Sequence, residues 1–323
     1  MSDQLTRMLG ERPWLLADGA MGTNLYNMGL APGQAPDLWN DSQPDKVADL
    51  HRQMIAAGAD LILTNSFGAN ATRLRVSGAE GRVAALNHAA AGLARDAAQD
   101  AKRPVTIAGS MGPTGEIMAP IGRLTEAEAT AIFTQQAEAL KEGGAELLWV
   151  ETISALEEMR AAARAAQSVG LPWCGTMSFE PGGRSMMGVT PPQLAALIDR
   201  LPHPPVAYGA NCGTGPAELL MVLAGFAASG NELPLIAKPN AGVPRYQDGG
   251  LIYDATPAVM AEFAVLARDL GVRIIGGCCG TTPAHLAAMH AALIETPPGP
   301  RPNTETISAR IGAAMRLAAE TGD

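Results

Sequence analysis

The stretch ELLWVETISALEEMRAAARAAQSVGLPWCGTMSF (146–179) contains one full repeat of the pattern that decides the fold. It begins with a short apolar run, 146–152, that turns polar at its end, and a second such run follows at 173–179. The segment between them is rich in Ala, Leu and Glu with helical spacing of its apolar residues, and Gly170 closes it. The stretch therefore predicts a strand, a helix and a second strand, with each strand buried on both faces.

The same alternation continues along most of the chain. The apolar runs lie at 14–20, 60–67, 105–112, 146–152, 173–179, 206–212, 233–240 and 272–279. Helix-like segments separate the runs, and Pro191 and Pro257 open two of these segments. Eight parallel βα units predict a (β/α)8 TIM-type barrel, an α/β fold of about 250 residues. The alternative is a doubly wound open sheet, but the first strand leads into DGAMGTN (18–24) rather than the GxGxxG that such sheets use for dinucleotides.

Composition limits the classes of protein that fit. Hydrophobic residues make up 47% and charged residues 17% of the 323 residues, which excludes wholesale disorder. The net charge of −9 argues against a non-specific nucleic-acid binder, because no basic surplus exists to neutralise phosphates. We find no secretory h-region and no apolar stretch long enough to span a membrane, so we expect a cytoplasmic protein.

The domain organisation follows from one proline-rich segment. The run IETPPGPRPNTET (294–306) has the composition of a linker, and an amphipathic helical pattern follows it at 308–320. We therefore expect residues 1–295 to form one barrel domain and residues 296–323 to form a linker and a C-terminal helix.

Three of the four cysteines fall at predicted strand ends. In a TIM-type barrel the working site is built at the carboxyl ends of the strands. Cys212 ends the sixth predicted strand, and Cys278 and Cys279 end the eighth, whereas Cys174 begins the fifth. Three thiolates with one open position are the arrangement expected of a reactive Zn²⁺ site. On the residues alone, packed inert thiols and a redox cluster remain alternatives.

Seven segments of the chain resemble the homocysteine S-methyltransferase family. They are DGAMGTN, ILTNSFGA, GSMGPTGE, WVETISALEE, GANCGTGP, KPNAG and GGCCGTTPAHL, and together they span about Trp14 to Leu293. The resemblance implies a (β/α)8 barrel, Zn²⁺ held by Cys212, Cys278 and Cys279, and homocysteine as the methyl acceptor.

The resemblance also implies roles for other residues at the strand ends. Asp18 and Gly19, with the amides that follow them, would hold the amino-acid end of homocysteine, and Glu151 would take its ammonium group. Asn240 is a further candidate at the substrate subsite, and we expect its amide oxygen to occupy the open metal position before substrate arrives. We expect Glu157 and Glu158 to lie on the solvated start of a helix.

The chemistry explains why a thiolate-rich metal site suits this reaction. A thiol with a pKa of about 8.5 is mostly protonated at neutral pH, and only the thiolate is a good nucleophile. Binding of the substrate sulfur to zinc deprotonates it, and the surplus negative charge of a four-thiolate centre keeps it electron-rich. Activity should therefore fall as the pH drops through the titration of the thiols.

The methyl donor is open among three candidates: betaine, S-methylmethionine and a methylated corrinoid. A trimethylammonium donor calls for an aromatic cage, yet SFGANATRLRVSG (66–78) offers only Phe67. ILTNSFGA, GPTGE and PNAG look closer to the homocysteine module of cobalamin-dependent methionine synthase. The sequence lacks a DxHxxG signature, so we expect a corrinoid donor to come on a separate partner protein. An inactive zinc-binding barrel subunit and a thiol redox protein are the alternatives from other classes.

Overall fold

The barrel forms from strands at all eight predicted runs. The computed structural model describes residues 3–227, 229–247 and 250–321. Within them the main sheet has the order β1-β10-β7-β6-β5-β4-β3-β2, with every neighbouring pair parallel. Its strands are β1 (Leu15–Leu16), β2 (Leu61–Leu63), β3 (Thr106–Met111), β4 (Leu147–Ile153), β5 (Trp173–Met177), β6 (Ala207–Cys212), β7 (Leu235–Pro239) and β10 (Val272–Ile275). A parallel bridge between Ala17 and Leu61 joins the two ends of this order, so the sheet closes and the predicted fold is confirmed.

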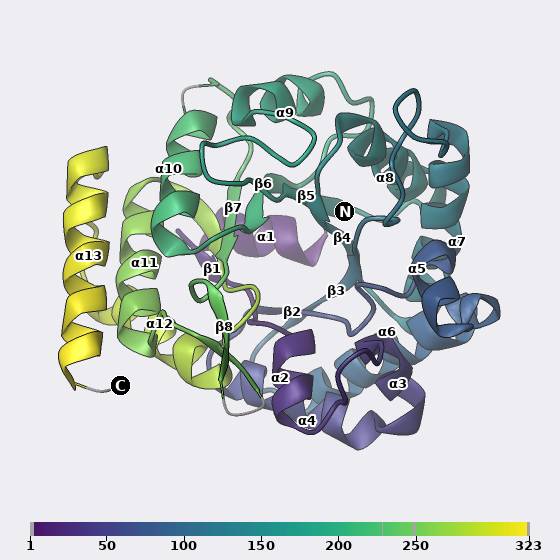
Figure 1. Ribbon diagram of the computed structural model, residues 1–323, viewed down its shortest axis with the longest axis horizontal. Helices are drawn as coiled ribbons and strands as arrows, with labels where there is room; N and C mark the ends of the chain where they lie inside the picture. Colours follow the sequence, from purple (N-terminus) through teal and green to yellow (C-terminus); the bar gives the residue numbers. More distant parts are fainter. Residues whose placement is uncertain (1–2, 228, 248–249, 322–323) are drawn as a thin grey trace.

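The helices form an outer layer around the strands (Figure 1). The helices of the barrel wall are α4 (Pro44–Ala56), α6 (Val83–Gln99), α7 (Glu126–Gly143), α8 (Leu156–Val169), α9 (Pro191–Ile198), α10 (Pro216–Ala227), α11 (Pro257–Asp269) and α12 (Pro283–Glu295). Their ends follow the local signals: Thr125 and Glu128 cap α7 reciprocally, and Pro191 and Pro257 are the first residues of α9 and α11 as predicted. None of the helices in the described ranges combines the length and the apolar character needed to cross a membrane.

Short elements fill the loops after the first two strands. They are α2 (Gly22–Asn27), a 3-10 turn at Pro36–Leu38, α3 (Trp39–Ser42), α5 (Ala71–Leu74), and 3-10 turns at Arg75–Ser77 and Glu80–Arg82. After β7 the chain makes an antiparallel hairpin of β8 (Pro244–Gln247) and β9 (Gly250–Tyr253). None of these elements was predicted from the sequence, because such short elements carry no sustained hydrophobic period.

The N-terminal helix α1 (Gln4–Glu11) closes one end of the barrel. Leu5, Met8 and Leu9 are buried in the same cluster as the side chains inside the barrel, and Gln4 bonds to Thr106 at the start of β3 (3.0 Å). In Figure 1 this helix crosses the ring of strands. Because α1 covers the ends where the strands begin, the opposite ends are the open face of the barrel.

The C-terminal helix α13 (Thr304–Thr321) lies outside the wall of the barrel. It packs against α11 and α10, and Figure 1 shows it alongside α11. Ile307 and Ile311 are buried in this contact, and Arg310 pairs with Glu262 of α11. The boundary between a domain of residues 1–295 and a tail of residues 296–323 stays a prediction.

The interior of the barrel changes from apolar to polar along the strands. Leu147 and Trp149 of β4 point into the barrel, and the period of two residues puts Glu151 on the same face one step further. By the same rule Ile236 of β7 is followed by Lys238. The apolar side chains pack as a core, and the polar side chains gather at the open face.

Candidate active site

The three cysteines at the strand ends converge at the open face. Cys212 is the last residue of β6, and Cys278 and Cys279 follow β10. Their sulfur atoms all lie within 4.8 Å of one another. The backbone N–H of Cys278 donates to the carbonyl of Pro239 (2.7 Å), which fixes the loop after β10 against β7. The structure thus brings these three thiols together, whereas Cys174 is buried inside the barrel.

A buried amide fixes the backbone beside this cluster. Cys212 and Thr152 adopt left-handed φ angles of 64° and 62°, which residues other than glycine rarely hold without support. Asn211, fully buried, accepts a hydrogen bond from the Thr152 N–H (2.8 Å) and donates one to the Thr152 hydroxyl (2.7 Å). Its amide nitrogen also lies 3.7 Å from the sulfur of Cys278. Asn211 therefore holds the strained ends of β4 and β6 in place and touches the thiol cluster.

Asn240 connects the two loops that carry the cysteines. Its amide oxygen accepts the N–H of Cys279 (3.1 Å), and its amide nitrogen donates to the carbonyl of Gly213 (2.6 Å). We expected this oxygen to face the open metal position, and the structure shows it bonded to the backbone instead. A buried N–H in a tight loop needs an acceptor, and Asn240 supplies it. In this arrangement Asn240 braces the cluster.

The thiols share their protons unequally. Hydrogen bonds from the thiols of Cys278 and Cys279 lower the pKa of Cys212 to about 3. The hydrogen bond to Cys212 raises the pKa of Cys278 to about 12, and the same neighbours raise the pKa of Cys279. Without a metal, the hydrogen bonds among the three thiols therefore stabilise a thiolate within the cluster.

The cluster fits a zinc ion by its donor atoms and its spacing. Tetrahedral Zn²⁺ with bonds of about 2.3 Å to sulfur separates its ligand sulfurs by about 3.8 Å. The three sulfurs here lie within 4.8 Å of one another, so small side-chain rotations suffice. Three protein ligands leave one position for a substrate, as in catalytic rather than structural zinc sites.

Two carboxylates lie at the same open face. Glu151 is 8% exposed and accepts a hydrogen bond from the Ser110 hydroxyl (2.6 Å). Burial raises the pKa of Glu151 to about 7, although the nearby Lys238 opposes this shift. Asp18 is 2% exposed and accepts the N–H of Leu63 (2.7 Å). Burial likewise raises the pKa of Asp18, again against the influence of Lys238.

Lys238 also belongs to the site, although it was not predicted from the sequence. Its ammonium group donates to the second carboxylate oxygen of Asp18 (2.8 Å), and its side chain is 2% exposed. A charged residue at the end of the apolar run LPLIAKPN (233–240) is the signal that could have revealed it, since a lysine inside a barrel strand must be paired.

A cavity of about 670 Å³ joins these groups. The residues of the site that line it are Asp18, Gly19, Glu151, Lys238, Cys212, Cys278 and Cys279. A Cβ atom on Gly19 would come within 2.6 Å of the carbonyl oxygen of Thr281, so only glycine lets the loop after β1 lie this close to the loop after β10. The Ala20 N–H donates to the same carbonyl (3.0 Å). The structure thus brings the predicted residues around one cavity, with Asn240 bracing its cysteine loops.

Glu158 differs from the expectation of a solvated helix start. Its carboxylate accepts hydrogen bonds from the N–H (2.8 Å) and the hydroxyl (2.7 Å) of Thr114, and it is buried, whereas Glu157 is half-exposed. The correction has a simple cause: α8 begins directly after β4, so one side of its first turn faces the loop after β3. Glu158 holds that loop, which lines the cavity.

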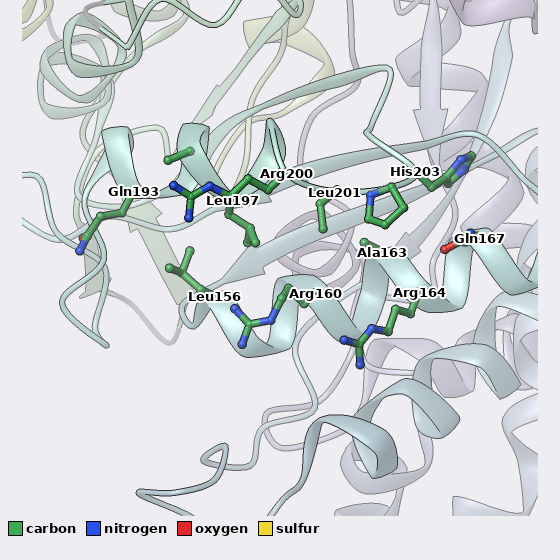
Figure 2. A pocket seen from close by; sticks show the side chains of 12 residues that line it. Leu156, Arg160, Ala163, Arg164, Gln167, Gln193, Leu197, Arg200, Leu201 and His203 are labelled. Atoms are coloured by element: carbon green, nitrogen blue, oxygen red, sulfur yellow. The ribbon is translucent and has the colours of Figure 1, made fainter.

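A second cavity, of about 590 Å³, lies between α8 and α9, and Figure 2 shows the side chains that line it. Arg160, Arg164 and Arg200 surround an apolar floor there. Arg160 and Arg164 pair with Glu126 at 3.2 and 2.8 Å. The thiols and the buried carboxylates lie elsewhere, at the strand ends, so the cavity at the open face is the candidate active site.

Comparison with known proteins shows the family of this chain. The homocysteine S-methyltransferase family matches residues 15–293. The methionine synthase of Mycobacterium tuberculosis (strain ATCC 25618 / H37Rv) is 31% identical over 296 residues, covering 86% of this chain and 24% of that protein. The methionine synthase of Mycobacterium leprae (strain TN) is 30% identical over 307 residues, covering 90% and 25%. The chain therefore spans about a quarter of the length of these relatives.

Among solved structures, the metallated form of the homocysteine methyltransferase MmuM from Escherichia coli is similar to this chain with a TM-score of 0.75. The two are 26% identical, and the match covers 89% of this chain and 99% of that chain. Because the family match extends over nearly the whole barrel, the chain belongs to the homocysteine S-methyltransferase family.

Proposed function

We propose that the protein transfers a methyl group to the sulfur of homocysteine and forms methionine, with Zn²⁺ held by Cys212, Cys278 and Cys279. The observation that carries this proposal is the convergence of the three sulfurs within 4.8 Å, in the same cavity as the buried carboxylate of Glu151. Thiol ligands suit a soft-to-borderline metal and a sulfur substrate, and the carboxylate suits an ammonium group.

The residues that line the cavity would have different roles. A zinc ion on the three cysteines would act as a Lewis acid and lower the pKa of the substrate thiol, so that the thiolate is present near neutral pH. Glu151 would bind the ammonium group of homocysteine, and its fixed hydrogen bond to Ser110 orients the carboxylate. The turn at Asp18 and Gly19 would receive the carboxylate end.

We infer that the methyl donor is a methylated corrinoid carried by a separate protein. The mycobacterial relatives named methionine synthase are about four times as long as the matched region. Their additional length supports a methyl donor that is carried by protein outside the matched barrel. Among the described residues, the aromatic side chains lining the cavity are Tyr26 and Phe67, too few to form a cage for a trimethylammonium group.

A donor used directly, S-methylmethionine or betaine, is the second candidate. The comparison with the Escherichia coli homocysteine methyltransferase favours this candidate, because the match covers 99% of that solved chain. An inactive zinc-binding subunit is the candidate from another class. The buried Glu151 beside the thiols argues against it, because a scaffold gains nothing from a carboxylate buried there.

The test is a donor panel on the reduced, zinc-loaded protein with methionine as the product assayed. Betaine, S-methylmethionine and methylcobalamin are each supplied with homocysteine, and methylcobalamin is also supplied on a corrinoid-binding protein. Cys278→Ser is the matched inactive control. Methionine formed only with the corrinoid supports the proposal, and efficient turnover with betaine or S-methylmethionine alone overturns the choice of donor. Zinc-dependent homocysteine binding without methionine from any donor would favour the inactive subunit.

A further inference from the structure

Lys238 is a buried cation inside a site dominated by negative charge. Its side chain is 2% exposed, and a lysine ammonium in such a place is stable only when it is paired. One partner is the carboxylate of Asp18 at 2.8 Å, and the ring of Trp149 lies below, with its centroid 5.4 Å from the ammonium nitrogen. This pair and the ring hold the ammonium at the floor of the cavity.

The charge of Lys238 also acts on the carboxylate of Glu151 and on the thiol of Cys278. Burial alone would lower the pKa of Lys238, but Asp18, Glu151 and Cys278 more than offset this and raise it, so the group stays positively charged. In return, Lys238 opposes the rise in the pKa of Glu151 and of Cys278. The positive charge therefore acts on both the carboxylate subsite and the thiol cluster.

The charge balance of the loaded site shows what Lys238 is needed for. With every group ionised, Asp18, Glu151 and the three cysteines contribute five negative charges, of which a zinc ion would compensate two. A substrate thiolate adds one more negative charge, whereas methionine, the product, carries a neutral thioether. Lys238 and Arg73 are the side-chain cations among the described residues that line the cavity. Of the two, Lys238 is paired with Asp18 and supplies the compensating charge beside the thiols. Its effect on the two ligands must differ, because only one of them brings a charged sulfur.

We propose that Lys238 is a positioning and specificity-determining residue that favours the anionic sulfur of the substrate over the neutral sulfur of the product. The inference rests on the proposed function, because it assumes that homocysteine binds at the thiol cluster. Homocysteine and methionine share their amino-acid end, so Lys238 discriminates between them only by the charge on sulfur. Weaker retention of the thioether assists release of the product after methyl transfer.

The test needs a variant that removes the charge without leaving Asp18 buried and unpaired. Lys238→Gln meets this need, because its amide N–H can still donate to Asp18, whose other oxygen keeps the bond to the Leu63 N–H. Lys238→Met is a second variant, which removes the donor as well as the charge. Lys102→Met, at an exposed lysine, is the control for net charge.

Urea unfolding and zinc content first establish that each variant is folded and loaded, and calorimetry then measures homocysteine and methionine binding. We expect Lys238→Gln and Lys238→Met to lose about 30-fold in homocysteine affinity, the effect of one charge several ångströms away in a buried site, and to retain methionine affinity. Lys102→Met should match the wild type for both ligands. Equal losses for both ligands, or an unchanged homocysteine affinity, would overturn the inference. Absence of zinc-dependent homocysteine binding by the wild-type protein would instead overturn the proposed function.

Discussion

Replacing Glu151 with glutamine should make the protein more stable at neutral and alkaline pH. Burial raises the pKa of Glu151 in the folded protein from its ordinary 4.5 to about 7. The folded state therefore holds this proton more tightly than the unfolded state does. The contribution of the group to stability is fully present below pH 4.5 and is lost as the pH rises through 7. The difference between these values corresponds to about 3 kcal/mol.

Glutamine removes the titration but keeps the hydrogen bond, since its amide oxygen can accept the Ser110 hydroxyl as the carboxylate does at 2.6 Å. The assay is urea unfolding of the reduced, metal-free protein at a series of pH values from 4.5 to 8, with wild type and variant compared at each pH. The free energy of unfolding of the variant should match that of the wild type at the acid end and exceed it by about 3 kcal/mol at the alkaline end.

Two features make the comparison decisive. Other groups titrate in this range, but they do so in both proteins, so the difference between the curves reports Glu151 alone. Glu138→Gln, at an exposed position of α7, changes the net charge equally and should run parallel to the wild type. Parallel curves for Glu151→Gln as well would refute the reasoning, because they would mean that Lys238 fully compensates the buried carboxylate. The same variant should also bind homocysteine more weakly, because it loses the carboxylate proposed to bind the ammonium group. The stability lost through the buried carboxylate would then serve substrate binding.

Three other predictions concern the candidate metal site and the barrel. Cys278→Ser should abolish stoichiometric zinc binding, whereas Cys174→Ala, inside the barrel, should retain one zinc per chain by elemental analysis; equal zinc in both would contradict the assigned ligand set. Asn240→Ala should weaken zinc binding about 10- to 100-fold in a chelator competition, because the brace between the cysteine loops is lost, and wild-type affinity would remove that role. Asp60→Ala should lower the free energy of unfolding by about 3 kcal/mol in urea, since it leaves the β1 backbone and Arg12 without their acceptor; an unshifted midpoint would argue against this.

The strands could be predicted because each is buried on both faces. Such a strand is a mainly apolar run, as in LPLIAKPN and VTIAGSMG, and it stands out against the helical spacing between the runs. The hairpin of β8 and β9 could not be predicted in this way, because it lies outside the barrel sheet and its strands have only four residues each. The small helices after β1 and β2 could not be predicted for the same reason.

The sequence by itself also determined which residues meet at the open face. A closed parallel barrel collects the carboxyl ends of all its strands at one edge, so Asp18, Glu151 and the three cysteines had to be neighbours once the strands were known. This inference needs only the order and polarity of the strands, which local patterns reveal.

The partners of those residues were decided by the tertiary structure. Lys238 and Asp18 are 220 positions apart, and Asn240 bonds to a backbone amide 39 positions away rather than facing the metal position. Glu158, on a helix start that the sequence marks as polar, is buried against Thr114. Each of these contacts depends on the distance between side chains of different loops, to within about an ångström. No periodicity along the chain encodes such a distance, because it is set only when the closed barrel fixes all the strand ends at once.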